Sequence, residues 1–246
     1  MPEPNPGAPV SYAVDSYYGD TVATRPASER AAFIKRTYLH LGGAILAFVG
    51  IEAALISSGM AVDIVQTMFA QRAAWLALMV VFIGGGFAAQ YMARSGQPVG
   101  VQYAGLALYV LLEVLIFLPI LTIAQLRFGA EVPLQAGMVT LLVFGGLTAG
   151  VFVSGKDFSW MGPILFVGSM LALGLVLAAV LFGFNLGLVF AVAMVGLAAG
   201  YIIYDTSNVM HRYGPGEHVA ASLALFASVA LMFYYVLRIF MATRDD

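Results

Sequence analysis

The sequence predicts an all-α membrane protein in which seven helices cross the bilayer. The chain of 246 residues is 61% hydrophobic and only 10% charged, whereas globular domains are roughly 45–50% apolar and about 25% charged. The apolar residues also gather in uninterrupted runs of about 20 residues, the length that a helix needs to cross a hydrocarbon core. A water-soluble fold of this size could not bury so much apolar surface, so we expect lipid around these segments.

Residues 1–30 precede the first apolar run and are rich in Pro, Ser, Gly and Tyr. They lack the basic start and the apolar centre of a secretory signal. We therefore predict a disordered cytoplasmic tail over residues 1–30 and a single transmembrane domain over residues 31–246.

Seven windows are long and apolar enough to be spans. They are Tyr38–Ser58, Ala73–Ala93, Val101–Leu126, Leu134–Ser154, Trp160–Phe182, Leu186–Tyr204 and Val219–Met241. Backbone polar groups in lipid must be hydrogen-bonded within the segment, so these windows are expected to be helices; barrel strands would be shorter and would alternate. A re-entrant last segment would leave six spans, but continuous apolarity over residues 219–241 favours a full crossing.

The distribution of Lys and Arg predicts a cytoplasmic N-terminus, because basic residues are enriched on the cytoplasmic side. With that orientation, the cytoplasmic side holds Arg25, Arg30, Lys35, Arg36, Arg94, Lys156 and Arg212, and the other side holds Arg72, Arg127, Arg238 and Arg244. The Ala- and Gly-rich composition without cysteine favours a bacterial inner membrane. The net charge of −2 and the absence of a basic run argue against a nucleic-acid partner.

Glycines at small-xxx-small spacing predict places where helices approach closely. Gly146 with Gly150 and Gly196 with Gly200 have this spacing. We interpret both pairs as packing contacts between helices.

Three acidic residues, Glu52, Glu113 and Asp205, lie within or at the end of a predicted span. Each costs roughly 2.5–3.5 kcal/mol to insert, so each is expected to face the bundle interior or an aqueous cavity. One hypothesis is an ion or proton path; the other is a structural ion pair or a neutral buried acid. Arg238, near the end of the last span, either pairs with Glu52 or extends to the interface.

Asp205 lies at the C-terminal end of the sixth predicted span. The helix dipole is negative there and the site is partly desolvated, and both effects disfavour the ionised carboxylate. The carboxylate could thus respond to pH near neutrality. The stretch "DTSN" at residues 205–208 also has good turn chemistry, so an ordinary turn acid is the competing interpretation.

Two long stretches carry a resemblance to a known family. "YDTSNVMHRYGPGEHVAASLALFASVALMFYYVLRIF" from residue 204 and "GKDFSWMGPIL" at 155–165, with "PIL" at 119–121, resemble the Bax inhibitor-1 family over roughly residues 30–241. The resemblance implies seven helices with the last helix central in the bundle. It also implies a pH-sensitive calcium leak channel in which Asp205 is gate and Ca²⁺ contact. Arg94 is similar in position to a basic residue that pairs with this acid in one gating state.

The resemblance breaks at the family's second aspartate, which would fall about one residue from Ser228. The stretch "ALFASVALMFYYVLR" at residues 224–238 contains no acid. A single carboxylate cannot share a proton with a partner, so coupled titration is lost. Ser228 could instead donate a hydrogen bond to Asp205 and stabilise its ionised form.

Some bacterial members of the family also lack the second acid. That branch resembles proteins that bind and restrain a membrane-anchored AAA protease, and the N-terminal tail would suit such a role. The alternative function is therefore a membrane regulator whose partner is a protease or another membrane protein. An enzyme is not expected, because the spans contain no nucleophile–base pair, metal-ligand cluster or cofactor motif. No cofactor is expected besides Ca²⁺ as the transported ion.

Overall fold

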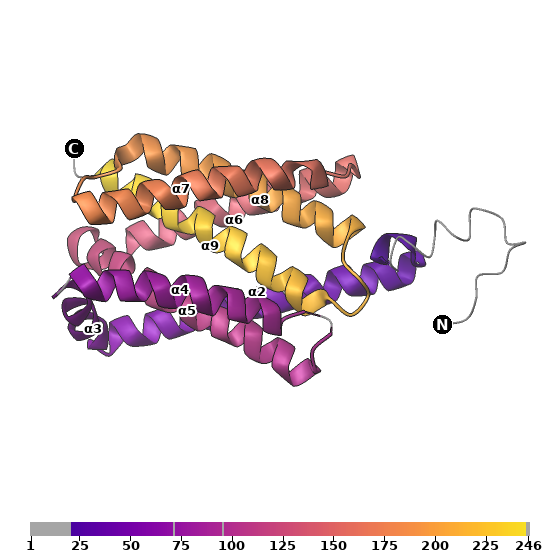
Figure 1. Ribbon diagram of the computed structural model, residues 1–246, viewed down its shortest axis with the longest axis horizontal. Helices are drawn as coiled ribbons and strands as arrows, with labels where there is room; N and C mark the ends of the chain where they lie inside the picture. The colour runs from indigo at the N-terminus through magenta and orange to yellow at the C-terminus, as the bar shows by residue number, and fades with distance from the viewer. Residues whose placement is uncertain (1–20, 71, 95, 245–246) are drawn as a thin grey trace, which may run out of the picture.

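The computed structural model describes residues 21–70, 72–94 and 96–244, and every regular element in this part of the chain is helical (Figure 1). The long helices are α2 (Ala27–Ser57), α4 (Arg72–Met92), α5 (Val99–Phe128), α6 (Glu131–Ser154), α7 (Gly162–Phe182), α8 (Gly187–His211) and α9 (His218–Ala242). Shorter elements are η1 (Val22–Thr24), α3 (Met60–Phe69) and η2 (Ser159–Met161). Among the described residues, seven helices are long and apolar enough to cross a membrane, which confirms the predicted fold class.

The last helix is central, as the resemblance implies. α9 contacts α2, α5, α6 and α8, and Figure 1 shows it running diagonally between one group made of α2 to α5 and another made of α6 to α8. In both α9 and α5, 67% of the most apolar window is buried, so α5 forms a second interior helix. Side chains on these two helices therefore decide what lines the centre of the bundle.

The helices are longer than the predicted spans at the end of the bundle that carries the N-terminus. α2 begins at Ala27 rather than at Tyr38, because residues 27–37 combine good helix formers with polar side chains. α8 continues past Tyr204 to His211, so the "DTSN" stretch is helical rather than a turn. Thr206 and Ser207 are fully buried against other elements, and this tertiary packing overrides their preference for turns.

The sequence did not predict α3. The segment between the first two predicted spans was expected to be only a connection. The helix is too short to cross a membrane, but it buries Ala61 and Val65 against Leu118 of α5. Gly59, with a φ of 79°, makes the sharp turn that separates α3 from α2. The exposed side of α3 mixes the apolar Met60 and Phe69 with the polar Asp63 and Gln66, so the helix is amphipathic.

The predicted tail lies partly outside the described residues. Nothing is described for residues 1–20, so disorder there stays a prediction. Residues 21–30 differ from the predicted disordered tail, because they form η1 and the first turn of α2. The backbone N–H of Val22 donates to the carbonyl of Tyr213 at 2.9 Å, and the Val22 side chain is buried, which fixes η1 against the end of α8.

The glycine pairs behave differently from one another. A Cβ at Gly200 would lie 2.7 Å from a methyl carbon of Leu165 in α7, which confirms close packing there. At Gly146, Gly150 and Gly196 a Cβ would meet nothing within 4 Å, so the predicted contacts at these positions are wrong. These three glycines are exposed on the outside of the bundle, where lipid rather than a neighbouring helix surrounds them.

Candidate functional site

Asp205 is buried in the interface between α8 and α9, with 7% of its surface exposed. The hydroxyl of Ser228, on α9, donates a hydrogen bond to its carboxylate Oδ2. The contact expected from the sequence is therefore present. No basic side chain of the described residues forms an ion pair with Asp205.

The charge of Asp205 acts on tyrosine side chains from three other segments. Tyr38 of α2, Tyr109 of α5 and Tyr213 of the α8–α9 loop each lie close enough to Asp205 for its charge to act on their hydroxyls. Burial raises the pKa of Tyr213, and the negative charges of Asp205 and Glu217 raise it further. Asp205 therefore interacts electrostatically with α2, α5 and the α8–α9 loop.

Several hydroxyls beside Asp205 have unused hydrogen-bonding capacity. The side-chain oxygens of Thr206 and Thr148 face the hydroxyl of Tyr38. All three oxygens are buried, yet none meets hydrogen-bond geometry with a described partner. Buried polar atoms are normally paired, so these three oxygens are a polar feature of the bundle interior.

Glu113 extends the polar interior along α5. It is 5% exposed and accepts a hydrogen bond from the hydroxyl of Tyr109, one turn earlier on the same helix. The charge of Asp205 also acts on Tyr109, so both carboxylates interact with this tyrosine. The sequence singled out both acids but not the tyrosine.

Glu52 has no described contact with Asp205, Tyr109 or Glu113. It is 3% exposed, and both of its carboxyl oxygens are buried without a hydrogen-bond partner among the described residues. The predicted alternative of a pair with Arg238 is wrong for this structure. The half-buried Arg238 instead faces Tyr234, one turn earlier on α9, and hydrogen-bonds to its hydroxyl.

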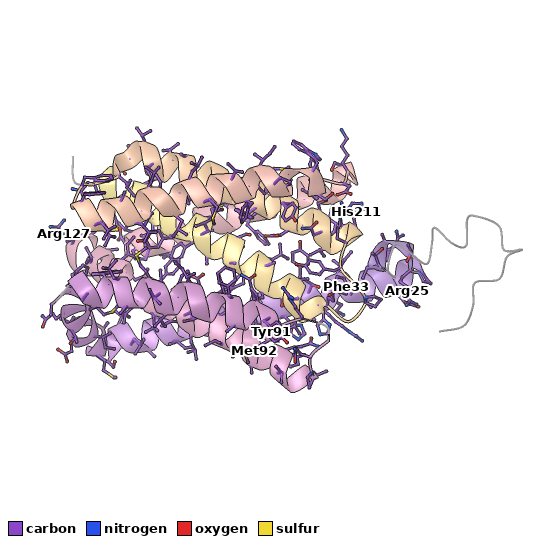
Figure 2. The ribbon with its side chains drawn as sticks, viewed as in Figure 1. Arg25, Phe33, Tyr91, Met92, Arg127 and His211 are labelled. Carbon is purple, nitrogen blue, oxygen red and sulfur yellow. The ribbon has the colours of Figure 1, made fainter. Side chains whose placement is uncertain are left out.

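Arg94 does not reach Asp205 in this structure. The residue is exposed just beyond the end of α4, and its guanidinium carbon lies 5.8 Å from the ring centre of Tyr91. The pairing that the resemblance implies for one gating state is therefore not formed here. Figure 2 shows Tyr91 and Met92 toward the end of the bundle where His211 lies, and Arg127 at the opposite end.

The two family-like stretches meet beside Asp205, which the sequence alone did not show. The backbone N–H of Phe158 donates to the hydroxyl of Ser207 at 2.8 Å, and Arg212 lies 3.8 Å from the Asp157 carboxylate. The backbone N–H of Ser159 donates to Asp157 at 2.8 Å and is the main cause that lowers the pKa of this exposed carboxyl. These contacts join residues 156–159 to the C-terminal end of α8. We call them the loop clasp.

The oxygen ligands available at Asp205 are too few for a stable calcium site. Ca²⁺ takes 6–8 oxygen ligands in a stable site. Within the part of the chain that the structure describes, no three His, Cys, Asp or Glu side chains gather in a way that could hold a metal ion. One carboxylate with a few hydroxyls can replace only part of the hydration shell of such an ion.

Comparison with known proteins agrees with this architecture. The pattern of the family described as "Inhibitor of apoptosis-promoting Bax1" matches residues 30–245. Protein lifeguard 4 of Mus musculus is 30% identical over 243 residues, with 97% of each chain covered. The Golgi anti-apoptotic protein of Vaccinia virus (strain Lister) is 29% identical over 97% of each chain. Bax inhibitor 1 of Schizosaccharomyces pombe is 36% identical over 117 residues, covering 46% of this chain and 43% of its own. With the seven long helices and central α9, these matches show that the chain belongs to the Bax inhibitor-1 family.

Proposed function

We propose that the protein is a passive, pH-sensitive leak for cations, with calcium as the expected ion and Asp205 as the gate. The observation that carries the proposal is the buried Asp205 carboxylate, hydrogen-bonded by Ser228 and without a basic partner among the described residues. Charged groups inside a membrane bundle usually mark ion pathways. The proposal includes no catalytic step and no bound cofactor.

The route begins at Asp205 and follows the polar side chains of the interior. A cation entering there meets the carboxylate and the unpaired hydroxyls of Tyr38 and Thr206. Tyr109 then leads to Glu113, one turn further along α5. These oxygens replace water around the ion in steps, which lowers the cost of taking it out of water.

Aromatic rings of α2, α5 and α9 form a packed layer close to Glu113 and Glu52. Phe117 lies one turn beyond Glu113 on α5, and Phe48 lies one turn before Glu52 on α2. Their ring centres are 5.0 Å apart, and Phe226 of α9 lies 6.2 Å from Phe48. A hydrophobic constriction of this kind excludes water and ions, so we assign the structure to a closed state.

The proposal takes the N-terminus as cytoplasmic and the membrane as the bacterial inner membrane. The excess of basic residues around the start of α2 and the end of α8 supports this orientation. Asp205 would then respond to cytoplasmic pH, because protonation removes the charge that attracts a cation.

The test is calcium flux into liposomes that contain the purified full-length protein. We expect flux above that of empty liposomes and a change in flux between about pH 6 and pH 8. Asp205→Asn is expected to remove this pH response. Asp63→Asn changes an exposed acid on α3 and is the matched control, which should behave as the unmodified protein.

Flux equal to that of empty liposomes at every pH would refute the leak. The alternative proposal, a regulator that restrains a membrane-anchored protease, would then be the better explanation. It predicts that such a protease co-purifies with the full-length chain and that deletion of residues 1–20 weakens the association.

A further inference from the structure

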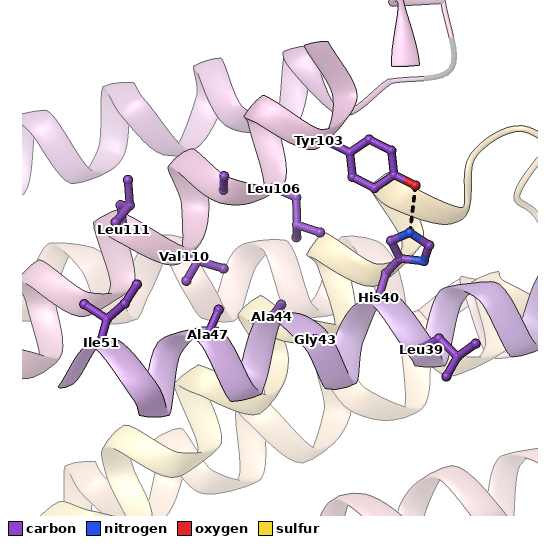
Figure 3. A pocket seen from close by; sticks show the side chains of 11 residues that line it. Leu39, His40, Gly43, Ala44, Ala47, Ile51, Tyr103, Leu106, Val110 and Leu111 are labelled. Carbon is purple, nitrogen blue, oxygen red and sulfur yellow. Dashed lines mark hydrogen bonds between the residues drawn. The ribbon is translucent and has the colours of Figure 1, made fainter. Parts of the chain in front are cut away.

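A groove runs between α2 and α5 on the outside of the bundle (Figure 3). Its volume is about 570 Å³, within the roughly 300–1,000 Å³ of typical ligand sites. Small residues line it on α2, namely Gly43, Ala44 and Ala47, and Leu106 and Val110 line it on α5. Gly43 has no side chain to fill the groove, and a Cβ at this position would meet nothing within 4 Å.

One end of the groove is polar. His40 Nδ1 lies 2.6 Å from the carbonyl oxygen of Arg36, which can only accept, so Nδ1–H is the donor. In the neutral ring, Nε2 then accepts from the hydroxyl of Tyr103 at 2.8 Å, the bond drawn in Figure 3. His40 and Tyr103 therefore make this end of the groove polar, and the ring of His218 lies 5.1 Å from that of His40.

Positive charge lies just beyond the polar end. Arg36 is exposed and precedes His40 by one helical turn, so it lies next to the polar end of the groove without being part of its lining. Its charge also acts on His218. The groove is thus apolar along its length and cationic at one end.

The length of the groove matches one leaflet of a bilayer. From Leu39 to Ile51 the α2 side spans twelve residue steps, or about 18 Å. Half of a hydrocarbon core is about 15 Å thick. The polar end then lies at the level of the lipid headgroups and the apolar end near the middle of the membrane.

We propose that this groove binds one anionic phospholipid, with an acyl chain against Gly43 and Ala47 and the phosphate at Arg36. An apolar trough of leaflet length with a cation at its interfacial end is complementary to such a lipid in both shape and charge. The site lies outside the Asp205 region, so it does not depend on the proposed leak.

The experiment is native mass spectrometry of the full-length protein titrated with phosphatidylglycerol, and in parallel with phosphatidylcholine of the same acyl chains. We expect phosphatidylglycerol to bind more tightly. Arg36→Gln should weaken phosphatidylglycerol binding about fivefold, because one basic residue near a membrane surface contributes about 1 kcal/mol. The affinity for phosphatidylcholine should not change.

Gly43→Leu fills the groove and is expected to abolish the tight site. Gly42→Leu is the matched control, because Gly42 lies at the same depth, has equal space for a side chain and does not line the groove. Circular dichroism and gel filtration check that each variant is folded, and Arg36→Gln tests the site without altering packing.

Three results would overturn the proposal: equal affinity for the two lipids, unchanged phosphatidylglycerol binding in both Gly43→Leu and Arg36→Gln, or displacement of the lipid by millimolar inorganic phosphate. The last result would indicate an anion site without an acyl-chain contribution.

Discussion

At the scale of residues, Asp205 accepts a hydrogen bond from Ser228 near the place where the resemblance puts a second aspartate. A serine gives the carboxylate a donor but cannot hold or release a proton near neutral pH. A pH response at this site would therefore depend on one carboxylate rather than on a coupled pair.

Replacing Ser228 by aspartate is expected to restore the coupled pair. Two carboxylates within hydrogen-bonding distance share one proton, so the calcium flux of Ser228→Asp should change more steeply with pH than that of the unmodified protein. Ser228→Asn, which is neutral and of similar size, is the control in the same liposome assay. Identical pH profiles for these two variants would contradict the expectation.

Asp157 gives a pH effect whose sign follows from its lowered pKa. The Ser159 N–H holds this pKa below the usual value of about 3.9. The ionised Asp157 carboxylate therefore contributes its full stabilisation of the loop clasp at pH values above the pKa of Asp157 in the unfolded chain. This stabilisation is lost as pH falls through the lower pKa that Asp157 has in the folded protein.

Asp157→Asn should accordingly speed hydrogen exchange at residues 158–161 near neutral pH. The increase should be no more than about fivefold, because exposed charge contacts contribute at most about 1 kcal/mol. The measurement is the rate of amide hydrogen exchange at each pH, divided by the intrinsic rate for an unprotected amide at the same pH. The variant and the unmodified protein should converge as pH falls through the folded-state pKa of Asp157; a difference that stays constant with falling pH would argue against a role for the carboxylate charge.

At the scale of elements, helix contacts depend on which glycines face a neighbour. Gly105 of α5 lies against α4, where a Cβ would be 2.6 Å from the carbonyl oxygen of Ala89 and 2.9 Å from Cβ of Met92. Gly146 of α6 faces outward with open space. The same residue type therefore has opposite roles on the two helices.

Gly105→Ala is expected to lower stability by about 1–3 kcal/mol, because the α4 backbone cannot move away without disturbing its own packing. Gly146→Ala is the matched variant and should raise stability by about 0.5–1 kcal/mol through helix propensity. Thermal unfolding in detergent, followed by circular dichroism, distinguishes them. Equal melting temperatures for the two variants would show that the α4–α5 approach is looser than the structure indicates.

At the scale of the whole molecule, α9 joins two groups of helices, and the aromatic layer closes the space around it. Phe117 is 1% exposed and contacts the rings of Phe48, Phe233 and Tyr234. These rings come from α2, α5 and α9, so a relative movement of the helix groups would disturb the layer. If the proposed leak exists, its ions would have to pass this layer of rings.

Phe117→Ala should therefore increase calcium flux in liposomes while lowering stability by about 3–5 kcal/mol. Phe182→Ala removes an equally large ring from an exposed position of α7 and serves as the control for both quantities. If folded Phe117→Ala leaked no faster than the control, the aromatic layer would not be the barrier.

The sequence by itself determined the number of spans, the burial of Glu52, Glu113 and Asp205, and the family. Spans follow from the sequence because lipid acts on each apolar run locally. A carboxylate within such a run must turn inward wherever its neighbours lie.

Only the tertiary structure decided which side chains meet. It brought Tyr38 and Tyr109 to Asp205, separated Arg238 from Glu52, made the "DTSN" stretch helical and buried one face of the short helix α3. The spans are apolar all round, so their sequence does not specify the face that each helix turns to a neighbour. That rotation is set by packing among all the helices at once, which is a property of the assembled bundle.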